Sequence, residues 1–236
     1  MTKKAVMSLS GGMDSTTLLA FLLDSGYEVE CLFFDYGSKH NPYEIEAMQK
    51  VAAHYQVPIT TFDLKPVMSK FKSNLLHNGG EIPEGHFEQD NMELTVVPSR
   101  NIIFMSIASG FAWSVEAQYI ALGIHFGDHA VYPDCRKEFY KAMDSALYLG
   151  TDRRVELLAP FVEMTKADIV SVGRKLDVPY GLTRTCYKNQ PIACGKCGSC
   201  VERQEAFALN GMVDPVMYED SEFWKSQTKI EELKNA

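Results

Sequence analysis

The sequence predicts an α/β protein with a doubly wound, mainly parallel sheet of five strands and a small C-terminal segment rich in cysteine. Three observations predict it. Short apolar runs alternate with amphipathic stretches, which is the pattern of parallel strands joined by crossover helices. A glycine-rich turn joins the first apolar run to the first amphipathic stretch, and four of the six cysteines lie within residues 186–200.

The first part of the chain predicts three strands and two helices. The strands are expected at residues 5–9, 28–34 and 57–62, and the helices at residues 16–23 and 43–55. Gly26 follows the first helix as a candidate C-cap. The second helix has an apolar stripe at helical spacing, which consists of Ile45, Met48, Val51, Ala52 and Tyr55.

Residues 69–95 show no periodicity, and we expect a flexible flap or loop over the site. Thr165 and Asp168 predict a capping box that opens a helix ending at Leu176, and a short helix is expected after Tyr218. Ligands of a doubly wound sheet bind beyond the carboxyl ends of its strands. The remaining expected elements are a buried helix (101–115), a strand (119–124), a helix (139–149) and a strand (155–159).

The string SGGMDS, residues 10–15, stands between the first strand and the first helix. Adjacent glycines allow a tight turn, and the N–H groups of the new helix favour an anion there. Ser10 and Ser15 add hydroxyl donors. Asp14 would repel a phosphate unless a Mg²⁺ ion accompanies it. The loop lacks the lysine of the common G-x-x-x-x-G-K-[ST] motif. A serine/glycine turn of no chemical meaning is the alternative interpretation.

Composition limits the function classes. The net charge of −8 argues against a broad nucleic-acid surface, which is normally basic. No apolar run is long enough to span a membrane, and residues 1–4 do not resemble a secretory signal. We therefore expect no membrane and a cytoplasmic location.

Cys186, Cys194, Cys197 and Cys200 form the pattern C-x7-C-x2-C-x2-C. Four soft ligands at this spacing suit a tetrahedral Zn²⁺ ion, and a site saturated with four thiolates would be structural. An iron–sulfur cluster has the same ligands, so spacing alone leaves it open, and a redox pair is a further alternative. Nothing else in the chain indicates electron transfer, which favours one zinc ion.

The loop SGGMDS resembles the pyrophosphate loop, S-G-G-x-D-S, of the PP-loop ATP-pyrophosphatase superfamily. Taken with Tyr-Pro-Asp-Cys-Arg at 132–136 and the four cysteines, it makes the chain similar to the 7-cyano-7-deazaguanine synthase family of queuosine biosynthesis. The resemblance extends to about Leu209. Further matches are Asp-Tyr-Gly at 35–37 with His40, Pro-Ser-Arg-Asn at 98–101, Leu-Ala-Pro-Phe at 158–161, Thr-Lys at 165–166 and Cys-Tyr at 186–187.

The resemblance implies an ATP-dependent carbon–nitrogen ligase that converts 7-carboxy-7-deazaguanine and ammonia to the 7-cyano product. An adenylated carboxylate and an amide would be intermediates. It further implies Mg²⁺ with ATP and a homodimer. It divides the chain into a nucleotide-binding α/β domain, residues 1–180, and a zinc-binding helical segment, residues 181–236.

The resemblance also implies roles for individual residues. Two of these residues also have a purely structural interpretation: Arg100 could be a solvated residue at a helix start, and Asp134 could only form a turn. The implied catalytic residues are Asp14, Lys166 and Arg100. The implied ATP-binding residues are Leu9, Ser10, Gly11, Gly12, Met13, Asp14, Ser15 and Thr16. The implied substrate-binding residues are Tyr36, His40, Asp128, Tyr132, Pro133, Asp134 and Arg136.

Several positions depart from the family pattern. Ala130-Val131 replaces an expected serine-glycine pair, Ser38 replaces a longer polar residue, and His125 and His129 are unusual. These changes leave open a relative that stops at the amide or couples the activated deazaguanine to another amine. A tRNA-modifying PP-loop protein is a third hypothesis, against which the acidic balance speaks.

Overall fold

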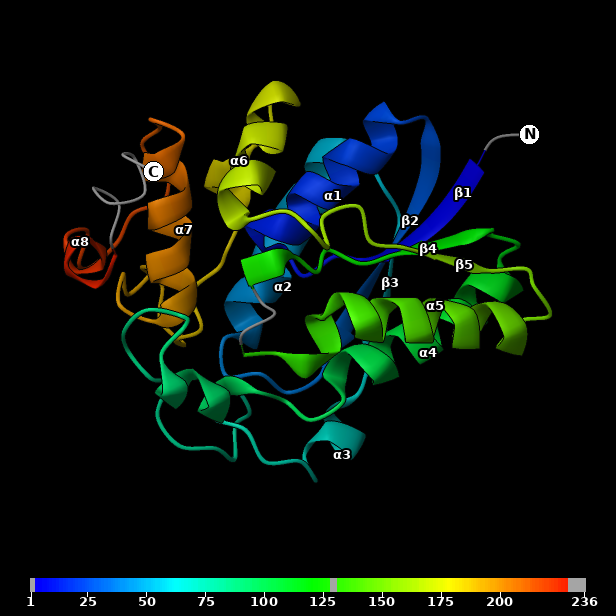
Figure 1. The fold of residues 1–236 in the computed structure, drawn as a ribbon, viewed down its shortest axis with the longest axis horizontal. Coiled ribbons are helices and arrows are strands. Elements are labelled where there is room, and N and C mark those ends of the chain that lie inside the picture. Colours follow the sequence, from blue (N-terminus) through cyan, green and yellow to red (C-terminus); the bar gives the residue numbers. More distant parts are fainter. Residues whose placement is uncertain (1–2, 128–130, 229–236) are drawn as a thin grey trace.

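The computed structural model describes residues 3–127 and 131–228. Five parallel strands form one sheet in the order β3-β2-β1-β4-β5. Figure 1 shows this sheet between two layers of helices, so the predicted fold class is confirmed. The strands are β1 (Lys3–Ser8), β2 (Tyr27–Asp35), β3 (Ile59–Asp63), β4 (Tyr119–Ala121) and β5 (Glu156–Leu158).

Alternate residues of the strands point to opposite helix layers. Val6 and Phe34 pack with α4 (Arg100–Ser114) and α5 (Lys137–Gly150) in one core cluster. Met7 and Phe33 pack with helices on the opposite face in a second cluster. Those helices are α1 (Met13–Asp24), α2 (Asn41–Tyr55) and α6 (Lys166–Lys175). Both sheet faces are therefore covered, as in a doubly wound fold.

The strand order places a topological switch point between β1 and β4. The chain moves outward from β1 through β2 to β3, then crosses back to β4 on the other side of β1. The connections that leave β1 and β4 diverge there, and a crevice opens at the carboxyl ends of these strands. The residues of these two connections that line the crevice are Ser10, Gly12, Leu122, Gly123, Ile124 and Gly127.

The observed element bounds differ from the predicted ones by a few residues. β4 ends at Ala121 rather than at residue 124. Leu122 donates to Leu158 O, but Phe126 N then donates to Met164 O, beyond β5. The apolar run therefore continues after strand pairing has stopped. The C-cap of α1 is Ser25 rather than the predicted Gly26, and Gly26 follows it with φ +80°, the left-handed conformation common just after a helix.

Residues 64–98 run below the sheet in Figure 1 and contain α3 (Lys65–Met68) and a 3₁₀ helix (Asp90–Thr95). Leu75 and Leu76 belong to the first core cluster, so part of the predicted loop packs against the α/β core. Its predicted flexibility stays a prediction.

The C-terminal part contains α7 (Gly198–Leu209) and α8 (Phe223–Gln227). The α7 residues from 198 to 207 are all buried, and α7 packs against α6. Met13 of α1 and Phe207 of α7 share a third core cluster. The predicted segment 181–236 is thus in contact with the α/β core through α7, and its standing as a separate domain stays a prediction.

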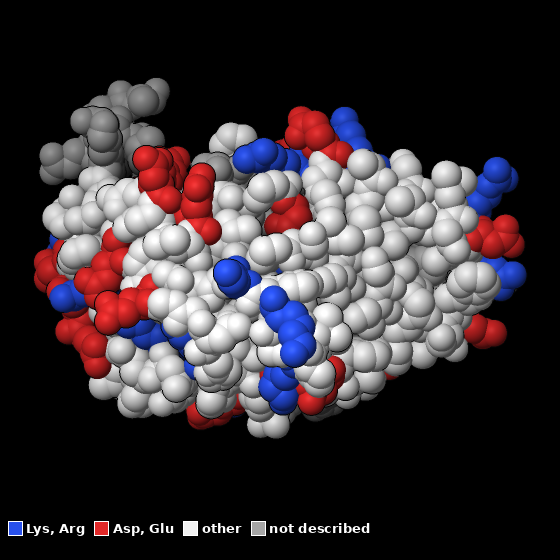
Figure 2. All heavy atoms as spheres, turned by 90° about the horizontal axis from the view of Figure 1, so that it is seen from below, with Lys and Arg blue, Asp and Glu red and all other residues white. Residues whose placement is uncertain are grey.

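The molecular face seen from below has an uneven charge distribution. Figure 2 shows acidic side chains around the end that carries the C-terminal part, and a largely uncharged surface over α4 and α5. Across residues 3–127 and 131–228, none of the helices has the length and apolar content needed to cross a bilayer.

Candidate active site

The SGGMDS loop is fixed by contacts that require glycine. Gly11 has φ +78°, and a Cβ atom there would lie 2.4 Å from Met48 N of α2. Ser10 Oγ lies 3.1 Å from Ser15 Oγ and accepts a hydrogen bond from Gly12 N. The loop is therefore held closely against α2 and closed on itself by its two serines.

The N-terminus of α1 opens beside this loop. Among the described residues, no side chain caps α1 at Gly12. The first N–H groups of a helix lack partners within the helix and carry its positive dipole end. This end of α1 can therefore bind an anion such as a phosphate.

A buried charge cluster lies beside the helix start. Lys166 Nζ lies 2.5 Å from Glu202 Oε2 and 3.4 Å from Asp14 Oδ2. His125 Nε2 lies 3.9 Å from the same Asp14 oxygen, and His125 Nδ1 accepts from Gly127 N. Three helices, α1, α6 and α7, thus place their charges at one end of the cleft.

The position of Lys166 follows from local sequence. Thr165 Oγ1 accepts from Asp168 N, and Asp168 Oδ2 accepts from Thr165 N, which completes the predicted capping box. This box fixes where α6 begins, so Lys166 stands at its first position. A cation at a helix N-terminus opposes the dipole. The two carboxylates nearby offset that cost.

A second group of polar residues lines the same cleft. His40 Nε2 lies 3.3 Å from Glu44 Oε1 across one turn at the start of α2. The Arg100 guanidinium lies 5.9 Å from the Tyr36 ring centre. We call Ser10, Gly12, Asp14, Lys166 and Glu202 the loop half of the cleft. We call Tyr36, His40, Glu44 and Arg100 the α2–α4 half.

Electrostatics keep the α2–α4 half charged. Burial alone would raise the pKa of the Glu44 carboxyl, but His40, Ser38 and Arg100 outweigh it, and the pKa is lowered. Burial opposes the charge of Arg100, yet Tyr36 and neighbouring groups raise its pKa. Burial and nearby Glu44 raise the pKa of Tyr36 to about 12. At neutral pH this half therefore offers an anion, a cation and a neutral phenol.

Most predicted site residues meet in this one cleft, although Asp128 lies outside the described residues. Leu9, Gly11 and Thr16 support the loop from behind, with Thr16 Oγ1 donating to Gly12 O. The predicted residues that line the cleft are Ser10, Gly12, Met13, Asp14, Ser15, Tyr36, His40, Arg100, Tyr132 and Lys166.

The Tyr-Pro-Asp-Cys-Arg segment is divided. Tyr132 and Cys135 line the cleft, whereas Pro133, Asp134 and Arg136 are not among its lining residues. Asp134 Oδ2 accepts from Asn101 N at the start of α4, and Asn101 Nδ2 donates to Asp134 O. Asp134 thus joins this segment to α4. The substrate contacts predicted for Pro133, Asp134 and Arg136 stay predictions.

Sequence reasoning missed two acidic residues of the cleft, Glu44 and Glu202. Glu44 stands four residues after His40, a spacing that places two side chains on one helix face. That spacing could have identified it. Glu202 follows the last cysteine by two residues, and nothing in the sequence indicates that α7 packs against α6.

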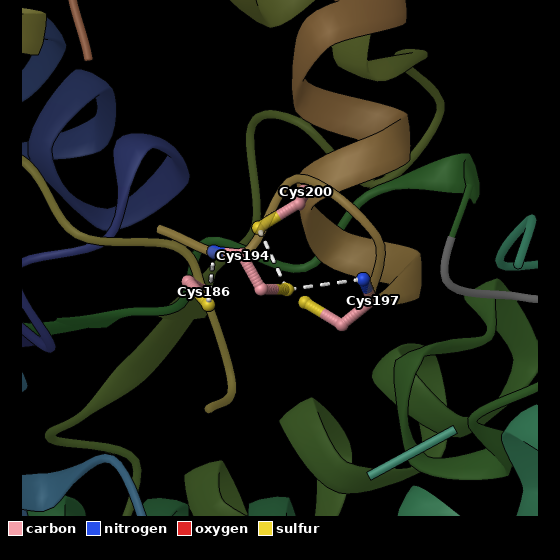
Figure 3. Close-up of side chains that lie close together, drawn as sticks. All are labelled: Cys186, Cys194, Cys197 and Cys200. Atoms are coloured by element: carbon pink, nitrogen blue, oxygen red, sulfur yellow. Dashed lines mark hydrogen bonds between the residues drawn. The ribbon is translucent and has the colours of Figure 1, made fainter. Parts of the chain in front are cut away.

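The four cysteines converge on one point. Their Sγ atoms all lie within 4.8 Å of one another, and all four residues are buried. Figure 3 shows the sulfurs facing inward from the 186–197 loop and the start of α7. In a tetrahedral site with Zn–S bonds of about 2.3 Å, neighbouring sulfurs lie about 3.8 Å apart. Cys194 Sγ and Cys200 Sγ lie 3.9 Å apart, so the cluster fits a metal ion such as zinc.

Backbone N–H groups surround the sulfurs. Cys186 Sγ accepts from the backbone N of Lys188 and Cys194, and Cys194 Sγ accepts from Lys196 and Cys197. Such donors offset the negative charge of four thiolates. The cluster is also tied to the SGGMDS loop, because Arg184 N donates to Gly11 O at 2.8 Å.

A glycine-rich loop at the switch point of a parallel sheet, an open helix N-terminus and a buried lysine define a doubly wound α/β protein with a site suited to an anionic ligand. Comparison with known sequences is more specific. Residues 4–211 match the family described as queuosine biosynthesis protein QueC, and the chain belongs to that family. The resemblance inferred from the sequence motifs is therefore confirmed.

Curated relatives cover nearly the whole chain. A 7-cyano-7-deazaguanine synthase of Archaeoglobus fulgidus is 46% identical over 97% of this chain and 95% of its own length. A synthase of the same name from Caldicellulosiruptor saccharolyticus is 44% identical over 95% of this chain and 100% of its own. Among solved structures, an NH3-dependent NAD synthetase of Campylobacter jejuni matches with a TM-score of 0.46, at 15% identity over 100% of this chain and 84% of that one. That structural likeness is too low to support an argument about function.

Proposed function

We propose that this protein converts 7-carboxy-7-deazaguanine and ammonia to 7-cyano-7-deazaguanine at the expense of ATP. The names of the relatives support the product. The observation that carries the ATP-dependent route is the juxtaposition, in one cleft, of an anion-binding loop with a separate subsite of charged and aromatic side chains. An enzyme that adenylates an acceptor needs these two subsites side by side.

The loop half would hold the phosphates of ATP. The N–H groups at the start of α1 and the hydroxyls of Ser10 and Ser15 face the cleft end where an anion is favoured. Lys166 would stabilise negative charge that develops as pyrophosphate leaves, because a fixed cation in a partly dehydrated site acts strongly on such charge. Glu202 keeps the Lys166 ammonium beside the loop.

Asp14 fits a magnesium ion that accompanies ATP. Its Oδ1 atom is buried and makes no hydrogen bond with any described residue, which leaves a carboxylate oxygen available for a cation. When bound, Mg²⁺ would neutralise phosphate charge during adenylation. Asp14 would orient this ion, and Lys166 beside it limits the repulsion between Asp14 and the phosphates.

The chemistry needs two activations of the same carbon. A carboxylate oxygen attacks the α-phosphorus of ATP and releases pyrophosphate. Ammonia then displaces AMP, which carries that oxygen away, and leaves an amide after loss of a proton. The amide oxygen attacks a second ATP in the same way, and loss of AMP and protons from nitrogen gives the nitrile. Arg100 would hold the carboxylate, as a guanidinium does readily.

The cysteine cluster would hold one Zn²⁺ ion with a structural role, since four thiolates leave no open position for a substrate. A zinc ion there would fix the start of α7 and the irregular segment that carries Cys186. Elemental analysis of the purified protein tests the identity of the metal. The predicted homodimer and cytoplasmic location stay predictions, and light scattering coupled to size exclusion would test the dimer.

Product mass tests the proposed function. The protein is incubated with 7-carboxy-7-deazaguanine, ammonium and Mg²⁺, with and without ATP, and products are identified by mass spectrometry. We expect the nitrile and AMP only when ATP is present. Accumulation of the amide would identify a relative that stops halfway. If neither ATP nor 7-carboxy-7-deazaguanine is consumed, the proposal is rejected. A gel shift with tRNA at several salt concentrations tests the third hypothesis.

A further inference from the structure

One carboxylate in the α2–α4 half has no role in the chemistry described above. Glu44 lies in the first turn of α2, and 13% of its side chain is exposed. It lines the cleft together with Tyr36, Phe104 and Tyr187, whose rings offer flat apolar surface. A charged side chain in such a place is costly unless it is paired or serves a ligand.

The carboxylate of Glu44 is held in a fixed orientation. Its Oε1 lies 3.3 Å from His40 Nε2, and its Oε2 accepts from Ser38 Oγ at 3.1 Å. A carboxylate has about four acceptor positions, two on each oxygen. His40 and Ser38 occupy one on each oxygen. Each oxygen therefore keeps one acceptor position, so this one carboxylate can accept two further donors.

Paired acceptors are complementary to one kind of heterocycle edge. A 2-amino-pyrimidin-4-one ring, as in guanine and 7-deazaguanine, presents a ring N–H and an exocyclic amino group as adjacent donors. A hypoxanthine-like ring lacks the amino group, and a xanthine-like ring has an oxygen in its place. An ionised carboxylate accepts both donors of the 2-amino-pyrimidin-4-one ring, and it repels the oxygen of the xanthine-like ring.

On the basis of the proposed function, we propose that Glu44 is the residue that selects a 2-amino-pyrimidinone acceptor, accepting its ring N–H and exocyclic amino group. His40 and Ser38 act as positioning residues that hold the carboxylate. Phe104 and Tyr36 contact each other edge to face, with ring centres 5.7 Å apart, and together form an apolar wall of the cleft against which a flat ring can lie. Specificity then comes from buried polar groups that a wrong ring would leave without partners.

The test compares two ligands and two variants. The ligands are 7-carboxy-7-deazaguanine and its analogue without the 2-amino group, and binding is measured by calorimetry as well as by turnover. The variants are Glu44→Gln and Glu46→Gln. Glu46 lies on the same helix, is exposed and pairs with Lys50, so its variant is a matched control.

We expect wild-type protein to bind the analogue about 10- to 150-fold more weakly, the range for one lost hydrogen bond to a charged group. Glu44→Gln should lower affinity for the 2-amino ligand by a similar factor. It should change affinity for the analogue much less, so that the preference shrinks. Glu46→Gln should leave both affinities and the preference unchanged. ATP affinity should be the same in all three proteins.

Three results would overturn the proposal. They are equal losses for both ligands in Glu44→Gln, no loss for either, and no preference in wild-type protein. The absence of a ligand preference is measured on wild-type protein alone. It therefore tests the proposal even if Glu44→Gln fails to fold, which circular dichroism would show. Failure of the proposed function is separate: it appears as tight, selective binding of the 2-amino ligand without ATP-dependent product.

Discussion

The two halves of the cleft are built in different ways. The loop half combines backbone N–H groups with side chains from one continuous stretch, residues 10–14 at the start of α1, and Lys166 and Glu202 are added from α6 and α7. The α2–α4 half is formed by side chains from separate helices, among them Glu44 and Arg100. Backbone groups recognise what all nucleotides share, whereas side chains distinguish one heterocycle from another. We therefore expect changes in the two halves to separate nucleotide binding from acceptor selection.

The largest effect should come from a substitution in the cysteine cluster, because the cluster holds residues of both halves of the cleft in place. Cys200→Ser should lower the free energy of unfolding by more than about 4 kcal/mol, since a structural zinc site contributes on the order of 10 kcal/mol. The α7 helix carries Glu202 to the loop half, and Tyr187, next to Cys186, lines the other half. Denaturant unfolding with and without chelator measures the loss. A metal-free protein with unchanged stability would contradict it.

A change at Asp14 should affect the loop half alone. Asp14→Ala is expected to lower ATP-dependent turnover on the order of 1,000-fold, as loss of a group that acts on developing charge does. Acceptor affinity and the melting temperature should be close to those of the wild type. Calorimetry with the acceptor and steady-state kinetics measure the two effects. Near-normal turnover by the folded variant would remove the loop from the mechanism.

Asp134→Ala should affect the α2–α4 half. The Asp134 carboxylate accepts from Asn101 N at the start of α4, which carries Arg100. Loss of this bond should cost about 0.5–2 kcal/mol of stability, as for other helix-capping side chains. Acceptor kcat/KM should fall about 5- to 150-fold, and nucleotide affinity should hardly change. If nucleotide affinity falls equally, the two halves are not independent at this position.

The smallest effect concerns the segment that lines the cleft beside α7. His86 Nε2 lies 3.4 Å from Glu205 Oε2, and this contact, although burial opposes it, raises the pKa of His86 above 6.5. Because the pKa of His86 is higher in the folded than in the unfolded protein, protonated His86 stabilises the fold at pH values below its unfolded-state pKa. This stabilisation is lost as the pH rises through its folded-state pKa. We expect a loss of less than about 1 kcal/mol between pH 6 and pH 8.5. His86→Gln should flatten that part of the stability profile in thermal melts.

Local patterns predicted most of the fold. The alternation of apolar runs with amphipathic stretches identified all five strands, and the glycines and cysteines marked two sites, because those chemistries depend on neighbouring residues. The end of β4 could not be predicted, since strand pairing depends on what β5 offers beyond Leu158. Glu202 was missed for a related reason, because it reaches the cleft only through the packing of α7 against α6. Glu44 differs, since its four-residue spacing from His40 is a local signal.

The contact between Gly11 and α2 joins the two halves mechanically. Gly11 lies so close to α2 that an added Cβ atom would be 2.4 Å from Met48 N. Glu44 stands one turn earlier on the same helix. We therefore expect any displacement of α2 to be transmitted to the loop. Such coupling is reciprocal, so ATP and the acceptor should change each other's dissociation constant by the same factor. The order in which the two ligands enter would then affect the kinetics but not the affinity of the ternary complex.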